Sequence, residues 1–178
     1  MQSNKLVVIF LIKFFGTYAL LSFLYSLYLN DTQNTTNFFS CAPITKAVAS
    51  QTSYILNSVG YDTVIEQHPE ELSIKLIIKG NYVSRIIEGC NAVSIIILFI
   101  SFIVSFSSKI LPTTLYIIFG SFLIYSINVV RIAIICIAMF EYPEYQDILH
   151  DIVFPSIIYG TTFLLWFIWI QKFSKLKK

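Results

Sequence analysis

Four long apolar segments limit the folds that this 178-residue chain can adopt. They cover residues 6–29, 91–106, 113–140 and 152–170. Such segments are typical of membrane-spanning helices, because an α-helix needs about 20 residues to cross a bilayer. Hydrophobic residues make up 56% of the chain, which is too apolar for a soluble domain of this length. We therefore predict one membrane-embedded domain over residues 1–178, whose first span is an uncleaved anchor.

The charged residues differ between the two sides of such a bundle. With four spans, the N-terminus, the turn 107–112 and the tail after residue 170 lie on one side. Counting the near end of the first span, all charged residues on this side are basic: Lys5, Lys13, Lys109, Lys172, Lys175, Lys177 and Lys178. All 10 acidic residues fall on the other side, in residues 30–90 and 141–151. The positive-inside rule then places both termini in the cytoplasm.

The outer segment, residues 30–90, is too long for a simple connector. Residues 43–59 carry apolar side chains at helical spacing, between a proline suited to a first turn and a glycine suited to a stop. This pattern predicts an amphipathic helix on the outer surface or over the bundle. Three segments rich in β-branched residues follow, separated by turn signals: residues 61–66, 72–79 and 82–87. They predict a β-hairpin or a small antiparallel sheet of two or three strands.

These patterns together predict an all-α integral membrane fold. We expect a four-transmembrane-helix bundle with a small extracytoplasmic amphipathic helix and β-hairpin. The hairpin leads the chain directly to Cys90, at the start of the second span. If the helix of that span begins at Gly89 or Cys90, the thiol lies at a helix N-terminus, where the dipole favours a thiolate. The alternatives are a buried structural thiol or a disulfide with Cys41, whereas Cys136 is predicted to be a packing residue.

Arg131 lies within the third span, about 27 Å from Thr113 at about 1.5 Å per residue. This is near the outer edge of a hydrocarbon core about 30 Å thick. Asn128 lies three residues earlier, on the same helical face. An arginine inside a membrane is costly and by default indicates a functional site. The alternative is a snorkelling or structural arginine that pairs with Glu88 or Asp151.

His150 precedes the fourth span on the outer side, and an imidazole exchanges protons near neutral pH. The alternative is a surface histidine without a role. At similar depth on neighbouring helices, Cys90, Arg131 and His150 suit acyl transfer. The thiolate attacks a peptide carbonyl, the imidazole acts as general acid and base, and the guanidinium stabilises the oxyanion or the thiolate. Asn128, Glu88 and Asn91 are predicted as supporting residues, with no metal and no cofactor.

The order of Cys90, Arg131 and His150 resembles that in the exosortase/archaeosortase family of membrane cysteine transpeptidases. The Asn-x-x-Arg spacing at 128–131 and the Glu-Gly-Cys-Asn context at 88–91 add to the resemblance, which is closest to the exosortase F subfamily. It covers about residues 85–170, and the first span loosely. The chain departs from the family in having fewer spans and in replacing the usual Ser-Gly or Thr-Gly after the cysteine with Asn-Ala.

The resemblance implies cleavage of C-terminal sorting signals of exported proteins and their transfer to an envelope acceptor. It also implies the bacterial cytoplasmic (inner) membrane, with the active site on the extracytoplasmic face. The expected partners are such a substrate with its transmembrane signal, the lipid bilayer and an accessory membrane protein, with no nucleic acid. The competing hypotheses are a non-enzymatic assembly factor that binds through the outer segment, and a small transporter. The absence of an inverted repeat argues against the transporter.

Overall fold

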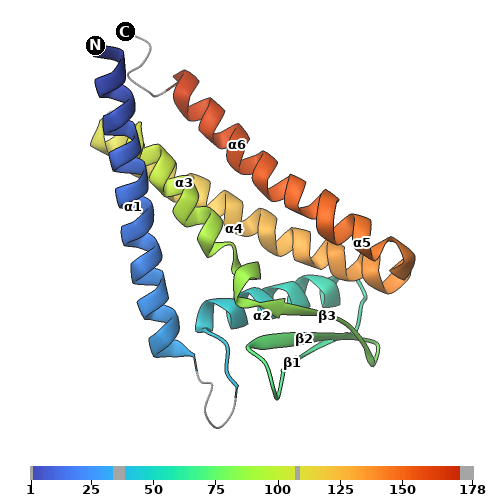
Figure 1. Ribbon diagram of the computed structural model, residues 1–178. Coiled ribbons are helices and arrows are strands. Elements are labelled where there is room, and N and C mark those ends of the chain that lie inside the picture. The colour runs from blue at the N-terminus through green and yellow to red at the C-terminus, as the bar shows by residue number, and fades with distance from the viewer. Residues whose placement is uncertain (1, 34–38, 107–108, 173–178) are drawn as a thin grey trace.

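A helical bundle carries a small helix-and-sheet unit at one end (Figure 1). The computed structural model describes residues 2–33, 39–106 and 109–172. The main helices are α1 (Gln2–Thr32), α2 (Pro43–Ser58), α3 (Val93–Ser105), α4 (Ile110–Glu141) and α6 (Phe154–Lys172). The strands are β1 (Thr63–Gln67), β2 (Ser73–Ile78) and β3 (Asn81–Ile87). The short turns are η1 (Glu88–Asn91), η2 (Pro143–Tyr145), α5 (Gln146–Ile148) and the π-helical η3 (Leu149–Val153).

Three helical segments of the described residues are long and apolar enough to cross a membrane: Lys5–Thr32, Ile110–Glu141 and Asp151–Lys172. They contain three of the four predicted spans. The fourth, residues 91–106, corresponds to α3, which has only 13 residues. At about 1.5 Å per residue, α3 is about 20 Å long, shorter than a hydrocarbon core of about 30 Å. The count of four spans therefore stays a prediction.

Helix α1 leaves most of its apolar side chains exposed, among them Ile12, Phe15 and Phe23 at 60% or more. It packs along α3, where the ring of Phe10 lies 4.5 Å from that of Phe106 between centroids. A soluble helix of this kind would bury a continuous apolar stripe against the protein. Exposure of apolar side chains around α1 is the pattern expected where lipid covers the helix.

The bundle core lies between α3, α4 and α6. Its fully buried side chains include Phe99, Ile124 and Trp169, each with 0% exposure. Gly120 of α4 lets α3 approach closely, because a Cβ at that position would lie 2.3 Å from a ring carbon of Phe99. This close approach fixes the position of α3, and hence of the turn η1 that precedes it.

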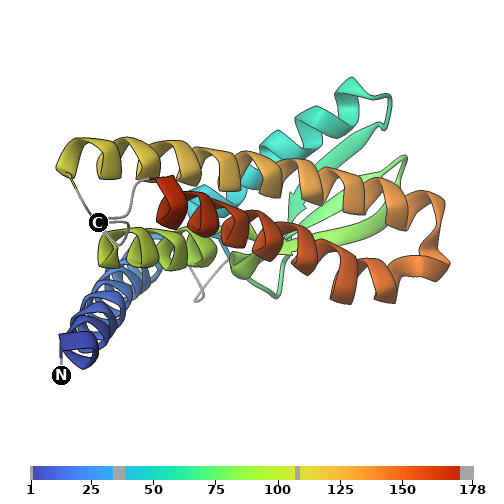
Figure 2. The ribbon, with the colours of Figure 1, turned by 90° about the horizontal axis from the view of Figure 1, so that it is seen from above.

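The outer unit is an antiparallel sheet in the order β1-β2-β3, packed against α2 and the C-terminal half of α4. Its buried core joins Val48 and Leu56 of α2 to Leu76 of β2, Ile86 of β3 and Ile132 of α4. The predicted amphipathic helix and antiparallel β element are thus present, and the sheet has three strands. Viewed from above, α4 and α6 run side by side, and the sheet lies beneath them (Figure 2).

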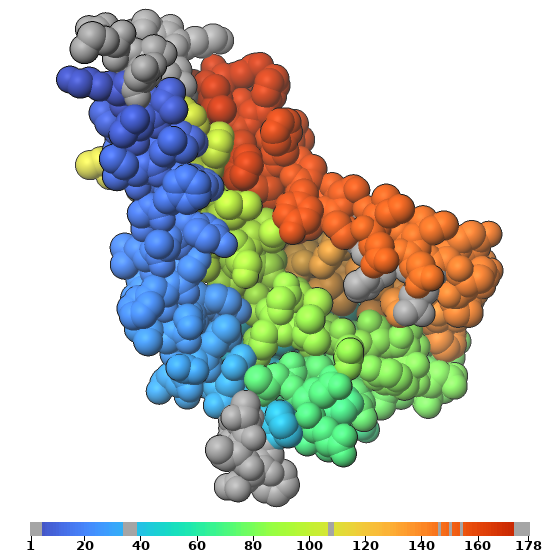
Figure 3. All heavy atoms as spheres, viewed as in Figure 1, coloured from blue at the N-terminus to red at the C-terminus, as the bar shows by residue number. Residues whose placement is uncertain are grey.

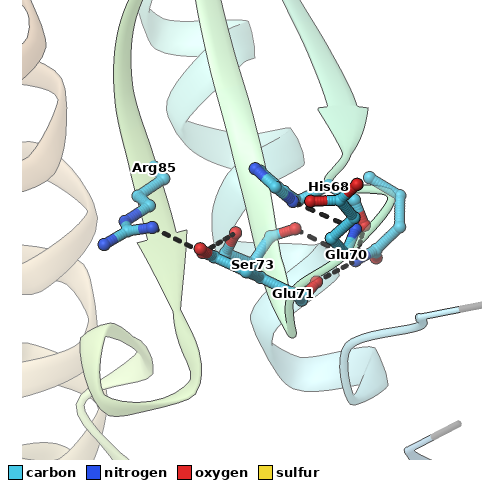
Figure 4. Close-up of polar contacts among 6 residues, drawn as sticks. His68, Glu70, Glu71, Ser73 and Arg85 are labelled. Atoms are coloured by element: carbon cyan, nitrogen blue, oxygen red, sulfur yellow. Dashed lines mark hydrogen bonds and ion pairs between the residues drawn. The ribbon is translucent and has the colours of Figure 1, made fainter. Parts of the chain in front are cut away.

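The turn between β1 and β2 is fixed by its own polar groups (Figure 4). The backbone N–H of Glu70 donates to Nδ1 of His68 at 3.2 Å, so this histidine stabilises the turn. Glu71 accepts a hydrogen bond from Arg85 of β3, which ties the turn to the third strand. His68 is therefore part of the hydrogen bonding that holds this turn.

Substituting Gly120 tests the contact between α3 and α4. Gly120→Ala places a methyl group against the buried ring of Phe99, and overpacking of this kind costs about 1–3 kcal/mol. We expect a lower midpoint of thermal unfolding in detergent. Gly160→Ala in α6 is the matched control, because nothing lies within 4 Å of the added Cβ. Equal midpoints for the two variants would contradict the close packing.

Candidate functional site

Cys90 lies in the 3₁₀ turn η1, between β3 and α3. The sequence left open a helix start at Gly89 or Cys90, but α3 begins at Val93. The backbone of Ala92 is left-handed, with φ of 64°, and the N–H of Val93 donates to Oδ1 of Asn91 at 3.0 Å. The thiol therefore precedes the first turn of α3. Its position is set by the contacts of η1 with its neighbours.

Glu88 fixes η1 to the start of α2. Its Oε1 accepts a hydrogen bond from the N–H of Ala42 at 2.7 Å, and its Oε2 accepts one from the hydroxyl of Thr45. Ala42 is the residue that caps the N-terminus of α2. An acceptor at this position satisfies a donor that the helix leaves unpaired, and the negative charge is favourable there.

Asn91 continues this network toward α1. Its Nδ2 donates to the hydroxyl oxygen of Tyr25 at 2.7 Å and to Oγ1 of Thr45 at 3.1 Å. Asn91 is 1% exposed and Thr45 is 0% exposed. Polar groups buried this deeply stabilise a fold only when they are paired. Two of the predicted supporting residues, Glu88 and Asn91, thus hold η1 in place between α1 and α2.

Asn128 of α4 connects Cys90 with Arg131. Its Nδ2 donates to the backbone carbonyl oxygen of Cys90 at 2.7 Å, and its Oδ1 accepts from Nη2 of Arg131 at 3.1 Å. The side chain of Asn128 is 2% exposed. Cys90 and Tyr159 of α6 lie within electrostatic range of the Arg131 guanidinium. The structure therefore brings three of the predicted site residues together, Cys90, Asn128 and Arg131.

His150 is the predicted site residue whose side chain lies outside the described part of the chain. Its backbone belongs to η3, the turn that leads into α6. The proposed contact between the imidazole and Cys90 therefore stays a prediction. The neighbouring π-helical geometry is itself notable, since π turns are rare and often lie at functional sites.

The three cysteines of the chain are free thiols, and they differ in exposure. Cys41 and Cys136 are 0% exposed, whereas Cys90 is partly exposed. Burial raises the pKa of the Cys41 thiol, while a hydrogen bond from Gln67 acts in the opposite direction. The Cys41–Cys90 disulfide considered from the sequence is not formed. Cys90 is the thiol that a substrate or reagent can reach.

A small cavity lies beside Arg131, between α4 and α6. Its volume is about 220 Å³, and its other lining residues include Ile127, Val130 and Ile157. The lining is apolar except for Arg131 and one serine, so this cavity suits a nonpolar group. Among the described residues, no group of three or more His, Cys, Asp or Glu side chains is placed to hold a metal ion.

Comparisons of the chain with models of protein families, with curated proteins and with solved structures find no match. The geometry around Cys90, Asn128 and Arg131 is therefore the feature of the molecule that indicates a function.

Thiol labelling tests this geometry directly. In detergent-solubilised native protein, we expect a polar maleimide to modify Cys90, because its side chain is partly exposed. Cys41 and Cys136 should react only after denaturation, since both are buried. Peptide mapping by mass spectrometry measures each site. Prior treatment with a reductant should leave the labelling of Cys90 unchanged, and a requirement for reductant would indicate a disulfide instead.

Proposed function

We propose that this chain is a membrane-embedded cysteine protease or transpeptidase of the exosortase type. It cleaves C-terminal sorting signals of exported proteins and transfers the proteins to an envelope acceptor. The observation that carries the proposal is the link made by Asn128, which holds the backbone of Cys90 on one side and the guanidinium of Arg131 on the other. A partly exposed thiol and a fixed cation at one place are the parts that thiolate chemistry needs.

The proposed topology has four passes with both termini in the cytoplasm of a bacterium. The N-terminal ends of α1 and α4 and the C-terminal ends of α3 and α6 lie at the same end of the bundle (Figure 1). This arrangement supports α3 as a short fourth pass, extended at the outer side by η1. Lys109 and Lys172 lie at the end that we assign to the cytoplasm, in agreement with the positive-inside rule. Cys90 then lies on the extracytoplasmic side.

In the proposed reaction, the Cys90 thiolate attacks the carbonyl carbon of the scissile peptide bond. A carbon–sulfur bond forms, the carbon–nitrogen bond breaks, and His150 donates a proton to the leaving amine. His150 then takes a proton from the acceptor nucleophile, which attacks the thioester and releases the thiolate. Arg131 stabilises the thiolate or the oxyanion, where a cation in a water-poor site acts strongly.

Asn128 has a positioning role in this scheme. It holds the carbonyl oxygen of Cys90 and leaves the sulfur unengaged by that contact. Its other end orients one nitrogen of the guanidinium. A planar side chain whose amide nitrogen and oxygen are both bonded in this way keeps the backbone of Cys90 and the guanidinium of Arg131 at a nearly fixed separation, and reactions that depend on a fixed geometry require this.

Cys90→Ala separates an enzyme from a non-enzymatic assembly factor. The probe is a tagged exported protein from the same bacterium whose C-terminus carries a transmembrane sorting signal. We expect processing to fall by about a thousandfold or more, because the nucleophile is removed. Membrane insertion of the variant should persist, and Cys41→Ala is the matched control because its thiol is buried. Processing that continues in Cys90→Ala would exclude the enzyme and favour the assembly factor.

Arg131→Lys tests whether the cation must be a guanidinium. Lysine keeps the charge but loses the planar set of donors that contacts Asn128, so we expect processing of the same probe to fall by about a hundredfold. Lys172→Arg is the control, because Lys172 is exposed in the last turn of α6, at the end that we assign to the cytoplasm. Near-normal turnover by Arg131→Lys would indicate that Arg131 has a structural role and no role in the reaction.

A further inference from the structure

The outer edge of β3 has no strand beside it in the described part of the chain. The sheet order is β1-β2-β3, so β3 pairs with β2 alone. The unpaired backbone groups of an edge strand are a template for another extended chain. Here the same strand leads within three residues of its end to Cys90. The edge of β3 and the candidate nucleophile are therefore continuous.

The hydrogen bonds of β2 show which groups of β3 point outward. The carbonyl of Ser73 accepts from His68 at 2.9 Å, and the N–H of Lys79 donates to Asp62 at 2.8 Å. The odd-numbered residues of β2 thus direct their backbone groups toward β1. Because these groups alternate along a strand, the even-numbered residues of β2 direct theirs toward β3.

In the register of β2 with β3, Ile74 is opposite Ile86 and Leu76 is opposite Ser84. Ile86 and Ser84 therefore use their backbone groups to bind β2. The N–H and C=O groups of Arg85 and the N–H of Ile87, between and after them, point to the outer edge, whereas the C=O of Ile87 accepts the first hydrogen bond of the turn η1. Ile87 is 46% exposed and the side chain of Arg85 is 51% exposed, so the face of the sheet that carries these two side chains is not covered by the described residues.

An irregularity in β3 marks the far end of this edge. The register shifts so that Ile77 is opposite Tyr82 while Leu76 is opposite Ser84, which leaves Val83 as an extra residue. Bulges of this kind bend an edge strand and end regular pairing. Regular pairing on the outer edge is thus confined to residues 84–87, next to η1.

Figure 3 shows a hollow in the molecular surface next to η1, between α6 and α3, with α4 behind it. A second cavity of about 290 Å³ lies where β3 begins, lined by Tyr82, Val83, Met139, Phe140 and Pro143 among others. From this cavity to Cys90 the edge extends for about 20 Å, which is the length of about six residues of extended peptide.

We propose that β3 is the docking strand for the substrate, an extended peptide that adds to the sheet beside Arg85 and Ile87. The proposal rests on the proposed function, since it supplies the peptide that Cys90 attacks. Backbone hydrogen bonds to two residues of β3 hold the peptide, and its scissile carbonyl lies at the thiol. The cavity at Tyr82 and Val83 receives a side chain farther along the peptide. Strand addition of this kind is a common mode of peptide recognition.

Alkylation of Cys90 by peptide chloromethyl ketones tests the docking without a natural substrate. The sulfur displaces chloride to form a thioether, and peptide mapping gives the rate at Cys90 in the full-length protein in detergent. We expect acetyl-(Ala)5-chloromethyl ketone to react about tenfold faster than acetyl-Ala-chloromethyl ketone, because the longer reagent pairs with β3. The same pentapeptide methylated on alternate amide nitrogens should lose this advantage.

Two variants at one position isolate the backbone contact. Ile87→Pro removes an N–H that points away from β2, so the sheet keeps its ladder while the docking edge loses a donor. Its ratio of pentapeptide to single-residue rates should fall to about one, whereas Ile87→Ala, which keeps the N–H, should retain about tenfold. An unchanged rate with the single-residue reagent shows that the thiol environment is intact.

The docking is wrong if wild-type protein reacts equally fast with both reagents, or if the methylated pentapeptide keeps its advantage. These results need no processing assay and no variant that must fold. A lack of length dependence together with Cys90-dependent processing would overturn the docking alone. Length-dependent alkylation together with normal processing by Cys90→Ala would overturn the proposed function alone.

Discussion

The hydrogen bonds around η1 (Glu88–Asn91) hold the outer unit on the helical bundle. Glu88 binds the start of α2, Asn91 binds Tyr25 of α1 and Thr45 of α2, and the carbonyl of Cys90 binds Asn128 of α4. Leaving one such buried group unpaired costs about 1–3 kcal/mol. Because several of these groups are almost fully buried, η1 cannot shift against the helices without that cost. Every other feature of the candidate site depends on this fixed turn.

The length of α4 explains why the site lies where it does. At 32 residues and about 1.5 Å per residue, α4 is about 48 Å long, more than a bilayer core requires. Its first half packs with α3 and α6 in the bundle, and its second half covers α2 and the sheet. Asn128 and Arg131 lie where one core gives way to the other. A cation there is held by the protein on one side while Cys90 stays accessible on the other.

The sequence was sufficient for the long helices, because continuous apolar segments set α1, α4 and α6, and turn signals separated the strands. It was not sufficient for the start of α3. Alanine rarely adopts the left-handed backbone conformation that Ala92 has, so its residue type did not predict the turn before α3. Apolar composition also could not divide α4 into a part that faces lipid and a part that covers the sheet, since both are equally hydrophobic.

The sequence predicts a site residue only where the signal is local, so the site residues were predictable to different degrees. Arg131 stood out because a charge within an apolar segment is costly wherever it lies. The roles of Glu88 and Asn91 depend on partners more than 40 residues away in the chain, Ala42, Thr45 and Tyr25, which no local pattern reveals. Tyr159 is one tyrosine among 11, and only the packing of α6 beside α4 places it near Arg131.

One physical requirement connects the proposed docking edge with the proposed chemistry. A transmembrane sorting signal has its backbone groups paired within a helix, and an unpaired group near the bilayer costs several kcal/mol. The scissile bond must leave the helix before the thiolate of Cys90 can reach its carbonyl. The outward N–H and C=O groups of Arg85 and the outward N–H of Ile87 would supply partners for the released groups at that boundary. Recognition by strand addition would thus also reduce the cost of unwinding, which a flat apolar surface beside Cys90 could not do.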